Sequence, residues 1–204
     1  MIVASGPSAG VTPVEVAQDR CRTIAINSSV DLVPWADILF ACDFQWWENR
    51  EGAQDFGGVK LSSARRACSK YEGVHLVKCN RHDDRTLMHN TGEVGWGGNS
   101  GFQALNLAMQ MKPSRIYLVG YDMRIDYGLH WHGDHPAPMH NPQEKNIPRW
   151  IKCLDQAAKT AKMMDITVIN CSLHSALRAY PKMTLQEALD DASTDAASGR
   201  EGPT

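Results

Sequence analysis

The sequence has no long apolar run and no marked excess of charge of either sign. No stretch approaches the ~20 consecutive apolar residues of a membrane-spanning helix, so no membrane span is expected. The 21 Lys and Arg residues nearly balance the 23 Asp and Glu residues, so nothing indicates a nucleic-acid-binding surface. The first residues lack the basic flank and long apolar core of a secretory signal, and we therefore expect a cytoplasmic protein.

Cysteine pairs with CxxC spacing are also missing, which removes the usual sign of a structural zinc site or a redox motif. The six cysteines are scattered along the chain. Cys42, Cys79 and Cys171 lie in or beside short apolar runs, so we interpret them as buried reduced thiols, which agrees with a cytoplasmic location.

Short apolar segments alternate with helix-like segments along the 204 residues. This pattern predicts a single Rossmann-like α/β domain over residues 1–192, with a mostly parallel sheet, helices on both faces and a flexible tail at 193–204. The expected strands are Ile2–Ser5, Thr23–Asn27, Ile38–Asp43, Val74–Cys79, Arg115–Tyr121 and Ile166–Cys171. The expected helices are Thr12–Asp19, Phe44–Arg50, Ser63–Lys70, Ser100–Met111, Ile147–Met164 and Thr184–Ala192. Segments 55–61, 82–98 and 123–146 are expected to be loops.

The first strand runs directly into a turn of small residues, Ser5, Gly6, Pro7 and Ser8. Thr12, Pro13 and Glu15 follow with the spacing of a capping box, which predicts an α-helix from Thr12. A loop that opens a helix at the carboxyl edge of a parallel sheet is a common phosphate site. The sequence lacks GxGxxG and Walker patterns here, and a tight turn without a ligand explains these residues equally well.

Polar residues also follow several later strands or precede helices. Asn27 and Asp43 each close a strand, and Asp122 follows the strand at 115–121. Asn99, Ser100 and Gly101 open an apolar helix and are suited to hold an anion through backbone N–H groups. The alternatives are helix caps and local turn hydrogen bonds. The paired Trp46 and Trp47 are either core rings or a ligand or partner contact.

Four of the eight histidines gather in the long loop, as His130, His132, His135 and His140. Three interpretations are open: a metal site, acid–base chemistry beside a phosphate or sugar hydroxyl, and a surface cluster. We favour acid–base chemistry, because the loop begins at the expected ligand edge and contains no cysteine. The loop is thus predicted to fold over the site as a lid without a structural metal, with His132 and His135 facing the ligand.

In their order along residues 1–180, these motifs resemble the bacterial sialyltransferases that use CMP-activated sialic acid and have a single Rossmann-like domain. The resemblance is carried by Ser5-Gly6-Pro7-Ser8, Asn27, Asn99-Ser100-Gly101, Gly120-Tyr121-Asp122 and the segment from Cys171 to Leu177. It implies a nucleotide-dependent glycosyltransferase that needs no metal cofactor for its chemistry. It further implies nucleotide-binding roles for Ser5, Gly6, Pro7, Ser8, Asn27, Asp43, Asn99, Ser100 and Gly101, and catalytic roles for His132, His135 and Asp122.

The pattern is similar, more broadly, to 6-hydroxymethylpterin pyrophosphokinases and to uncharacterised phage-encoded proteins. This likeness keeps two alternatives open. One is a pyrophosphokinase-like enzyme in which Asp43 or Asp122 holds Mg²⁺ against ATP phosphates. The other is a phage accessory protein, in the host cytoplasm, that binds a nucleotide or a partner through Trp46 and Trp47 without turnover. In each case a nucleotide or nucleotide-sugar is the expected partner, and a homo-oligomer is compatible with the sequence.

Overall fold

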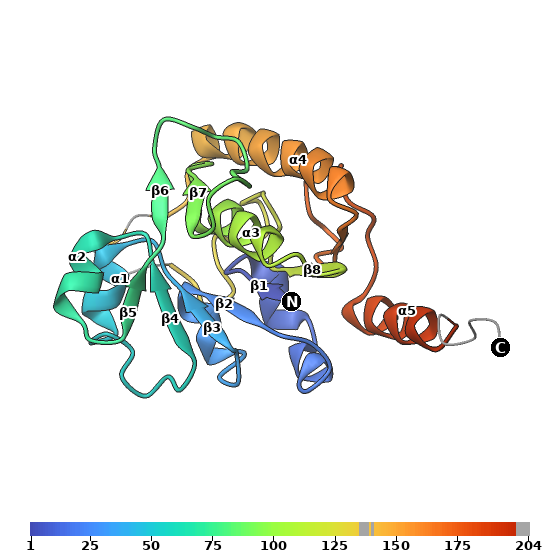
Figure 1. The fold of residues 1–204 in the computed structure, drawn as a ribbon, viewed down its shortest axis with the longest axis horizontal. Coiled ribbons are helices and arrows are strands. Elements are labelled where there is room, and N and C mark those ends of the chain that lie inside the picture. The colour runs from blue at the N-terminus through green and yellow to red at the C-terminus, as the bar shows by residue number, and fades with distance from the viewer. Residues whose placement is uncertain (135–138, 140, 199–204) are drawn as a thin grey trace.

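A seven-stranded, entirely parallel sheet forms the centre of the chain (Figure 1). The structure, a computed structural model, describes residues 1–134, 139 and 141–198. The strand order is β5-β4-β3-β2-β1-β8-β9, which confirms the predicted Rossmann-like α/β domain. The strands are β1 (Ile2–Val3), β2 (Ile24–Ile26), β3 (Ile38–Phe40), β4 (Val59–Ser62), β5 (Val74–Leu76), β8 (Arg115–Val119) and β9 (Thr167–Asn170).

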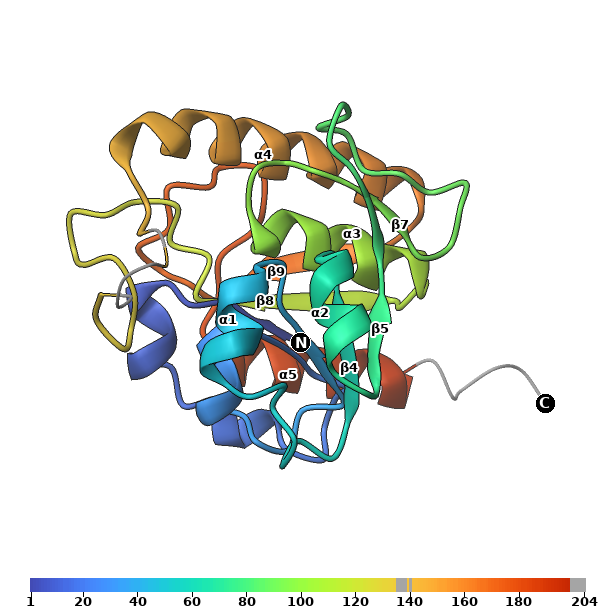
Figure 2. The same cartoon turned by 90° about the vertical axis from the view of Figure 1, so that its left-hand side faces the viewer.

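Helices cover both faces of the sheet, as Figure 2 shows. Alternate strand residues point to opposite faces, so Ile2 packs into one core cluster and Val3 into the other. One face is covered by α3 (Ser100–Gln110) and α4 (Ile147–Met163), and the other by α1 (Phe44–Asn49), α2 (Arg65–Lys70) and α5 (Leu185–Ser198). Because both faces are buried, the strands carry the nearly continuous apolar runs seen in the sequence.

The predicted α-helix at Thr12–Asp19 is wrong. Two 3₁₀ turns, η1 (Pro7–Val11) and η2 (Val14–Ala17), occupy this region instead. The hydroxyl of Thr12 donates to the carbonyl of Ser8 at 2.8 Å, so it does not cap a helix beginning at Pro13. Pro13 lacks the N–H that would join the two turns, and Gly10 weakens any helix that includes it.

The single strand predicted at Val74–Cys79 is divided between two sheets. Its first half is β5, and its second half, β6 (Lys78–Asn80), pairs with β7 (Glu93–Gly95) in a separate two-stranded parallel sheet. The buried Val77 lies at the division and donates its N–H to the carbonyl of Ser62 at 2.9 Å. The strands β4 and β7 fall where loops are expected, because their residues are too polar to show a strand pattern.

The spacing of Thr184 and Glu187 also predicts a capping box, which the structure confirms, and the helix behind it is longer than expected. The N–H and hydroxyl of Thr184 donate to a carboxylate oxygen of Glu187 at 2.9 and 2.7 Å, and the N–H of Glu187 donates back at 3.3 Å. Helix α5 continues to Ser198, so residues 193–198 of the predicted tail are helical. Residues 199–204 lie outside the described residues.

All six cysteines are free, and Cys171 is buried while Cys42 and Cys79 are partly buried. Among the residues that the structure describes, no helix combines the length and apolar character needed to cross a membrane.

Asn106 of α3 fixes the long connection between β6 and α3. Its side chain is fully buried and accepts hydrogen bonds from the N–H groups of Leu87 (2.9 Å) and Gly95 (3.0 Å). Its amide also donates to the carbonyl of Leu87 at 2.9 Å. One buried side chain therefore satisfies three backbone groups, two of Leu87 in the loop and one of Gly95 at the end of β7.

We expect Asn106→Ala to lower the free energy of unfolding by about 3 kcal/mol, because it leaves several buried backbone groups without partners. Urea denaturation checks this value. The matched control is Asn90→Ala in the same connection, because Asn90 is exposed and donates only to Glu93. The control is expected to change stability by less than about 0.5 kcal/mol. Equal effects of the two substitutions would contradict the role assigned to Asn106.

Candidate functional site

A cavity of about 330 Å³ opens at the carboxyl edge of the sheet, between the loops that follow β1 and β8. The chain leaves β1 toward β2 and leaves β8 toward β9, in opposite directions along the sheet. In open parallel sheets such a point leaves a crevice, and ligands bind there. The cavity is lined by Ala4–Gly6, Ile26, Asn27, Asp43, Gly98–Gly101, Gly120, Asp122–Ile125, Leu129, His130, Asn141, Pro142, Asn146, Ile147 and Trp150.

Most of the predicted site residues meet in this cavity, although they come from separate parts of the chain. Those in its wall are Ser5, Gly6, Asn27, Asp43, Asn99, Ser100, Gly101 and Asp122. Pro7 and Ser8 form the start of η1 and do not line the cavity. His135 lies outside the described residues, as does His140.

Two glycines allow the β1 and β8 loops to touch. The N–H of Gly6 donates to the carbonyl of Gly120 at 3.0 Å. A Cβ atom on Gly6 would lie 2.1 Å from Oδ2 of Asp122, and one on Gly120 would lie 2.2 Å from the carbonyl oxygen of Ala4. Gly120 also has a φ of +74°, in the left-handed region that favours glycine. Only glycine therefore fits at both positions.

Asp122 holds the β1 loop in place. Its carboxylate accepts hydrogen bonds from the N–H of Ser8 at 3.2 Å and from the Ser8 hydroxyl at 2.8 Å. Burial raises the pKa of Asp122, and the two bonds from Ser8 offset this only in part. Asp122, which the sequence suggested as catalytic, is thus already hydrogen-bonded within the protein. Its contacts with Ser8 make it a residue that positions the β1 loop, and it also borders the cavity.

The helix N-terminus at this site belongs to α3 and not to the segment after β1. The five-residue turn η1 is too short to provide the aligned peptide dipoles expected there. Helix α3 has 11 residues, and its first residues Ser100 and Gly101 line the cavity. Asn99 caps it, because its side-chain oxygen accepts a hydrogen bond from the N–H of Phe102 at 2.8 Å.

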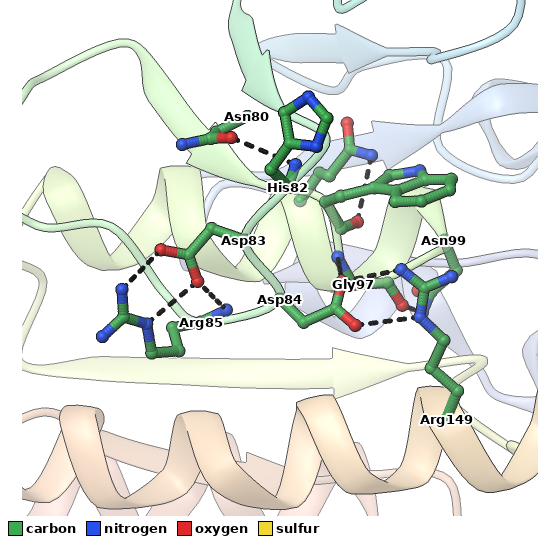
Figure 3. A network of polar contacts seen from close by, with 10 residues as sticks. Asn80, His82, Asp83, Asp84, Arg85, Gly97, Asn99 and Arg149 are labelled. Carbon is green, nitrogen blue, oxygen red and sulfur yellow. Dashed lines mark hydrogen bonds and ion pairs between the residues drawn. The ribbon is translucent and has the colours of Figure 1, made fainter.

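An ion pair from outside the cavity holds the glycine turn before α3 (Figure 3). Arg149 of α4 binds Asp84 through two hydrogen bonds of 2.9 and 2.7 Å, and Asp84 accepts a third from the N–H of Gly97 at 3.1 Å. The bonds from Arg149 lower the pKa of Asp84. The Arg149 guanidinium also lies 4.3 Å from the centre of the Trp96 ring. Sequence patterns do not reveal this ion pair, because its partners are 65 residues apart.

Asn27 has two features that are unusual for a strand end. Its φ of +52° lies in the left-handed region, where asparagine is several-fold enriched but still uncommon. Its Oδ1 atom is buried and accepts no hydrogen bond from any described residue. A strained backbone and an unsatisfied acceptor in a cavity wall are together typical of a ligand contact.

The segment that follows Asp122 forms one side of the cavity. The N–H of Trp131 donates to the carbonyl of Ser5 at 3.1 Å, which fastens this segment over the β1 loop. Fastened in this way, the segment places His130 in the cavity wall, whereas His132 does not line it. The His132 ring stacks on that of His130 with centroids 5.1 Å apart. His130 is thus the histidine in the wall of this cavity, and that His132 faces the ligand stays a prediction.

Arg124 brings a guanidinium group to this wall, and its charge is paired with that of Asp126. It makes two hydrogen bonds with Asp126 and a third with the carbonyl of His174 at 3.2 Å. Within residues 1–134, 139 and 141–198, no group of three or more His, Cys, Asp or Glu side chains is placed to hold a metal ion. That the histidine loop binds no structural metal stays a prediction.

Trp46 and Trp47 belong to the core. Their exposed fractions are 2% and 0%, and their rings meet edge to face with centroids 5.1 Å apart. Trp46 donates to the hydroxyl of Ser28 at 3.2 Å, and Trp47 donates to that of Ser62 at 3.0 Å. They therefore form no recognition surface, contrary to one of the sequence-based alternatives.

Comparisons with protein-family models, with curated proteins and with solved structures find no match for this chain. The function must therefore be argued from the site itself.

Gly6→Ala is expected to lower the free energy of unfolding by about 1–3 kcal/mol, because its new methyl group would overlap Asp122 and the Gly120 carbonyl. The control is Gly57→Ala, whose added Cβ would meet nothing within 4 Å. Chemical denaturation of both variants is the measurement, and a Gly6→Ala protein as stable as the control would refute the close approach of the two loops.

Asp122→Asn tests the raised pKa of this carboxyl. The folded protein holds the Asp122 proton to higher pH than the unfolded chain, whose carboxyl has the usual value near 3.8. Unfolding therefore releases a proton in the range above that value, and rising pH favours the unfolded state there. Relative to Asp122→Asn, the wild type should lose stability as pH rises from about 4 toward 7.

Urea denaturation of the two proteins at matched pH values measures this difference. A difference that stays constant, or that changes in the wild type's favour as pH rises, would show that the pKa of Asp122 is not raised.

Proposed function

We propose that this protein is a nucleotide-dependent transferase resembling the CMP-sugar glycosyltransferases, with its nucleotide in the cavity between β1 and β8. The observation that carries the proposal is the convergence of Asn27, the α3 N-terminus and the β1 loop on this one cavity. A cavity at this position in a parallel sheet is the usual nucleotide site of doubly wound folds. Its volume of about 330 Å³ is at the small end of the range for small-molecule pockets.

The α3 N-terminus is the proposed phosphate subsite. The backbone N–H groups of Ser100 and Gly101 lie in the first turn of the helix, where they have no partner within it. The positive end of the helix dipole favours an anion at this place. Asn99 and the Asp84–Arg149 pair hold the turn in position, so a phosphate would bind without reordering the loop.

Asn27 is the proposed contact to the base or ribose. Its buried Oδ1 would accept a hydrogen bond from an amino or hydroxyl group of the nucleotide, which removes the cost of an unsatisfied acceptor. This contact favours a ligand with a donor group, such as the exocyclic amine of cytosine or a ribose hydroxyl.

His130 is the proposed general base. In an inverting transfer, the acceptor hydroxyl oxygen attacks the anomeric carbon, the bond from that carbon to the CMP phosphate oxygen breaks, and the hydroxyl proton passes to the imidazole. Such a base contributes about 10²–10⁴-fold in rate. Arg124, on the same wall, would stabilise the negative charge on the departing CMP.

Titration calorimetry against CMP, CDP, CTP, ATP, GTP and UDP tests the proposal, with cytidine nucleotides expected to bind most tightly. Asn27→Ala is expected to weaken CMP binding at least about tenfold, because it removes the proposed hydrogen-bond acceptor. The control is Asn49→Ala, an exposed asparagine on α1, with no change expected. His130→Ala should leave CMP affinity within about threefold but slow release of CMP from CMP-sialic acid about 10²-fold or more.

Other outcomes would replace the proposal. Binding to none of the nucleotides removes it. Mg²⁺-dependent turnover of ATP favours the pyrophosphokinase-like alternative, and tight nucleotide binding without turnover favours an accessory binding protein.

A further inference from the structure

A second cavity, of about 470 Å³, lies farther along the same carboxyl edge of the sheet. It begins at the end of β4 and extends along β6, the strand that leaves the main sheet. Ser63, Arg65, Lys78, Cys79, Arg81 and Glu93 are its polar lining residues, and we call it the basic groove.

The three cations of the basic groove outnumber the one carboxylate beside them, that of Glu93, which lies opposite Lys78 in the β6–β7 pairing. Arg65, Lys78 and Arg81 are exposed and form no ion pair with any described residue. Most other described arginines do form one, including Arg85 in the same connection. Glu93 is the one acidic residue named in the lining, and it accepts a hydrogen bond from Asn90 at 3.2 Å. Net positive charge therefore remains in a concave site, where it attracts anions.

The end of β3 lies between the basic groove and the proposed nucleotide cavity in the order of the strands. Cys42 follows β3, and its thiol donates to the side-chain carbonyl of Gln103 at 3.0 Å. Ser100 of the cavity wall and Ser63 of the groove wall both act to lower the pKa of this thiol. Burial raises the pKa of this thiol to about 12, so Cys42 is a neutral spacer and not a nucleophile. Adjacent strands lie about 4.8 Å apart, which puts the ends of β1 and β4 roughly 14 Å apart.

We propose that the basic groove binds an anionic group, phosphate or carboxylate, on the acceptor substrate, and that the acceptor reaches along the sheet edge to the nucleotide cavity. The assignment of this anion to an acceptor substrate rests on the proposed transferase function. The anion site itself is argued only from the charges that line the groove. Two arginines and a lysine around a hollow suit an anion, because the guanidinium fork binds phosphate or carboxylate through paired hydrogen bonds.

Amide chemical shifts of the ¹⁵N-labelled full chain locate the site when glycerol 3-phosphate, D-glycerate and CMP are titrated separately. We expect glycerol 3-phosphate, D-glycerate or both to change the amide chemical shifts of Ser63, Arg65, Lys78 and Arg81. Comparing the two ligands shows whether the groove prefers a phosphate or a carboxylate. CMP is expected to shift Asn27, Ser100 and Gly101 instead. The proposed function can therefore fail, with no CMP response, while the groove still binds its anion.

Arg65→Ala/Arg81→Ala is expected to weaken the anion's binding at least about tenfold, while leaving CMP affinity unchanged. The matched control is Lys159→Ala/Arg178→Ala, which removes two exposed cations that form no ion pair with a described residue. An equal loss in both variants, shifts spread over unrelated lysines and arginines, or no shift in the groove with either anion would overturn the proposal. Heteronuclear spectra of each variant show whether it remains folded.

Discussion

The candidate site depends on the contact between the β1 and β8 loops. Neighbouring parallel strands whose chains leave in opposite directions open a crevice at their carboxyl ends, and here the backbones of the two loops close against each other. Gly6 and Gly120 make that closure possible, since a methyl group at either place would overlap the opposite loop. The bonds from Ser8 to Asp122 then hold the two loops together above the closed edge. The cavity forms where the other loops surround this contact.

Polar side chains extend this arrangement to α3, one of them buried (Asn106) and one partly exposed (Asp84). Asn106 fixes the middle of the connection between β6 and α3, and Asp84 fixes its end at Gly97. Because Arg149 anchors Asp84 from α4, the start of α3 is held from both the sheet side and the outer helix. Electrostatic binding sites require donors that are already oriented, and this layer of contacts supplies that order.

The sequence predicted the parallel sheet and most of the cavity wall because both depend on local signals. Apolar runs mark buried strands, and polar residues at their ends meet whenever the strands are parallel. The same signals failed at Thr12–Asp19, where a capping-box spacing surrounds Pro13 in a segment that folds as two 3₁₀ turns. Local sequence signals also could not reveal the Asp84–Arg149 ion pair, because its partners meet only through tertiary contacts. For the same reason they could not show that His130, and not His132, lines the cavity. The HxH spacing shows that two rings lie together but does not show which one meets the cavity.

The small β6–β7 sheet has a consequence for how the molecule moves. An isolated pair of three-residue strands is too small to be stable alone, and this one depends on α3 beneath it and on its continuity with β5. Segments of this kind open as cooperative units without unfolding the rest of a protein. Residues 78–82, which precede the anchors at Asp84 and Leu87, therefore form a region of lower local stability, and their amide protons should exchange with solvent sooner than those of β1, β2 and β8. The wall of the basic groove would then adapt to its ligand, while the neighbouring cavity keeps its shape.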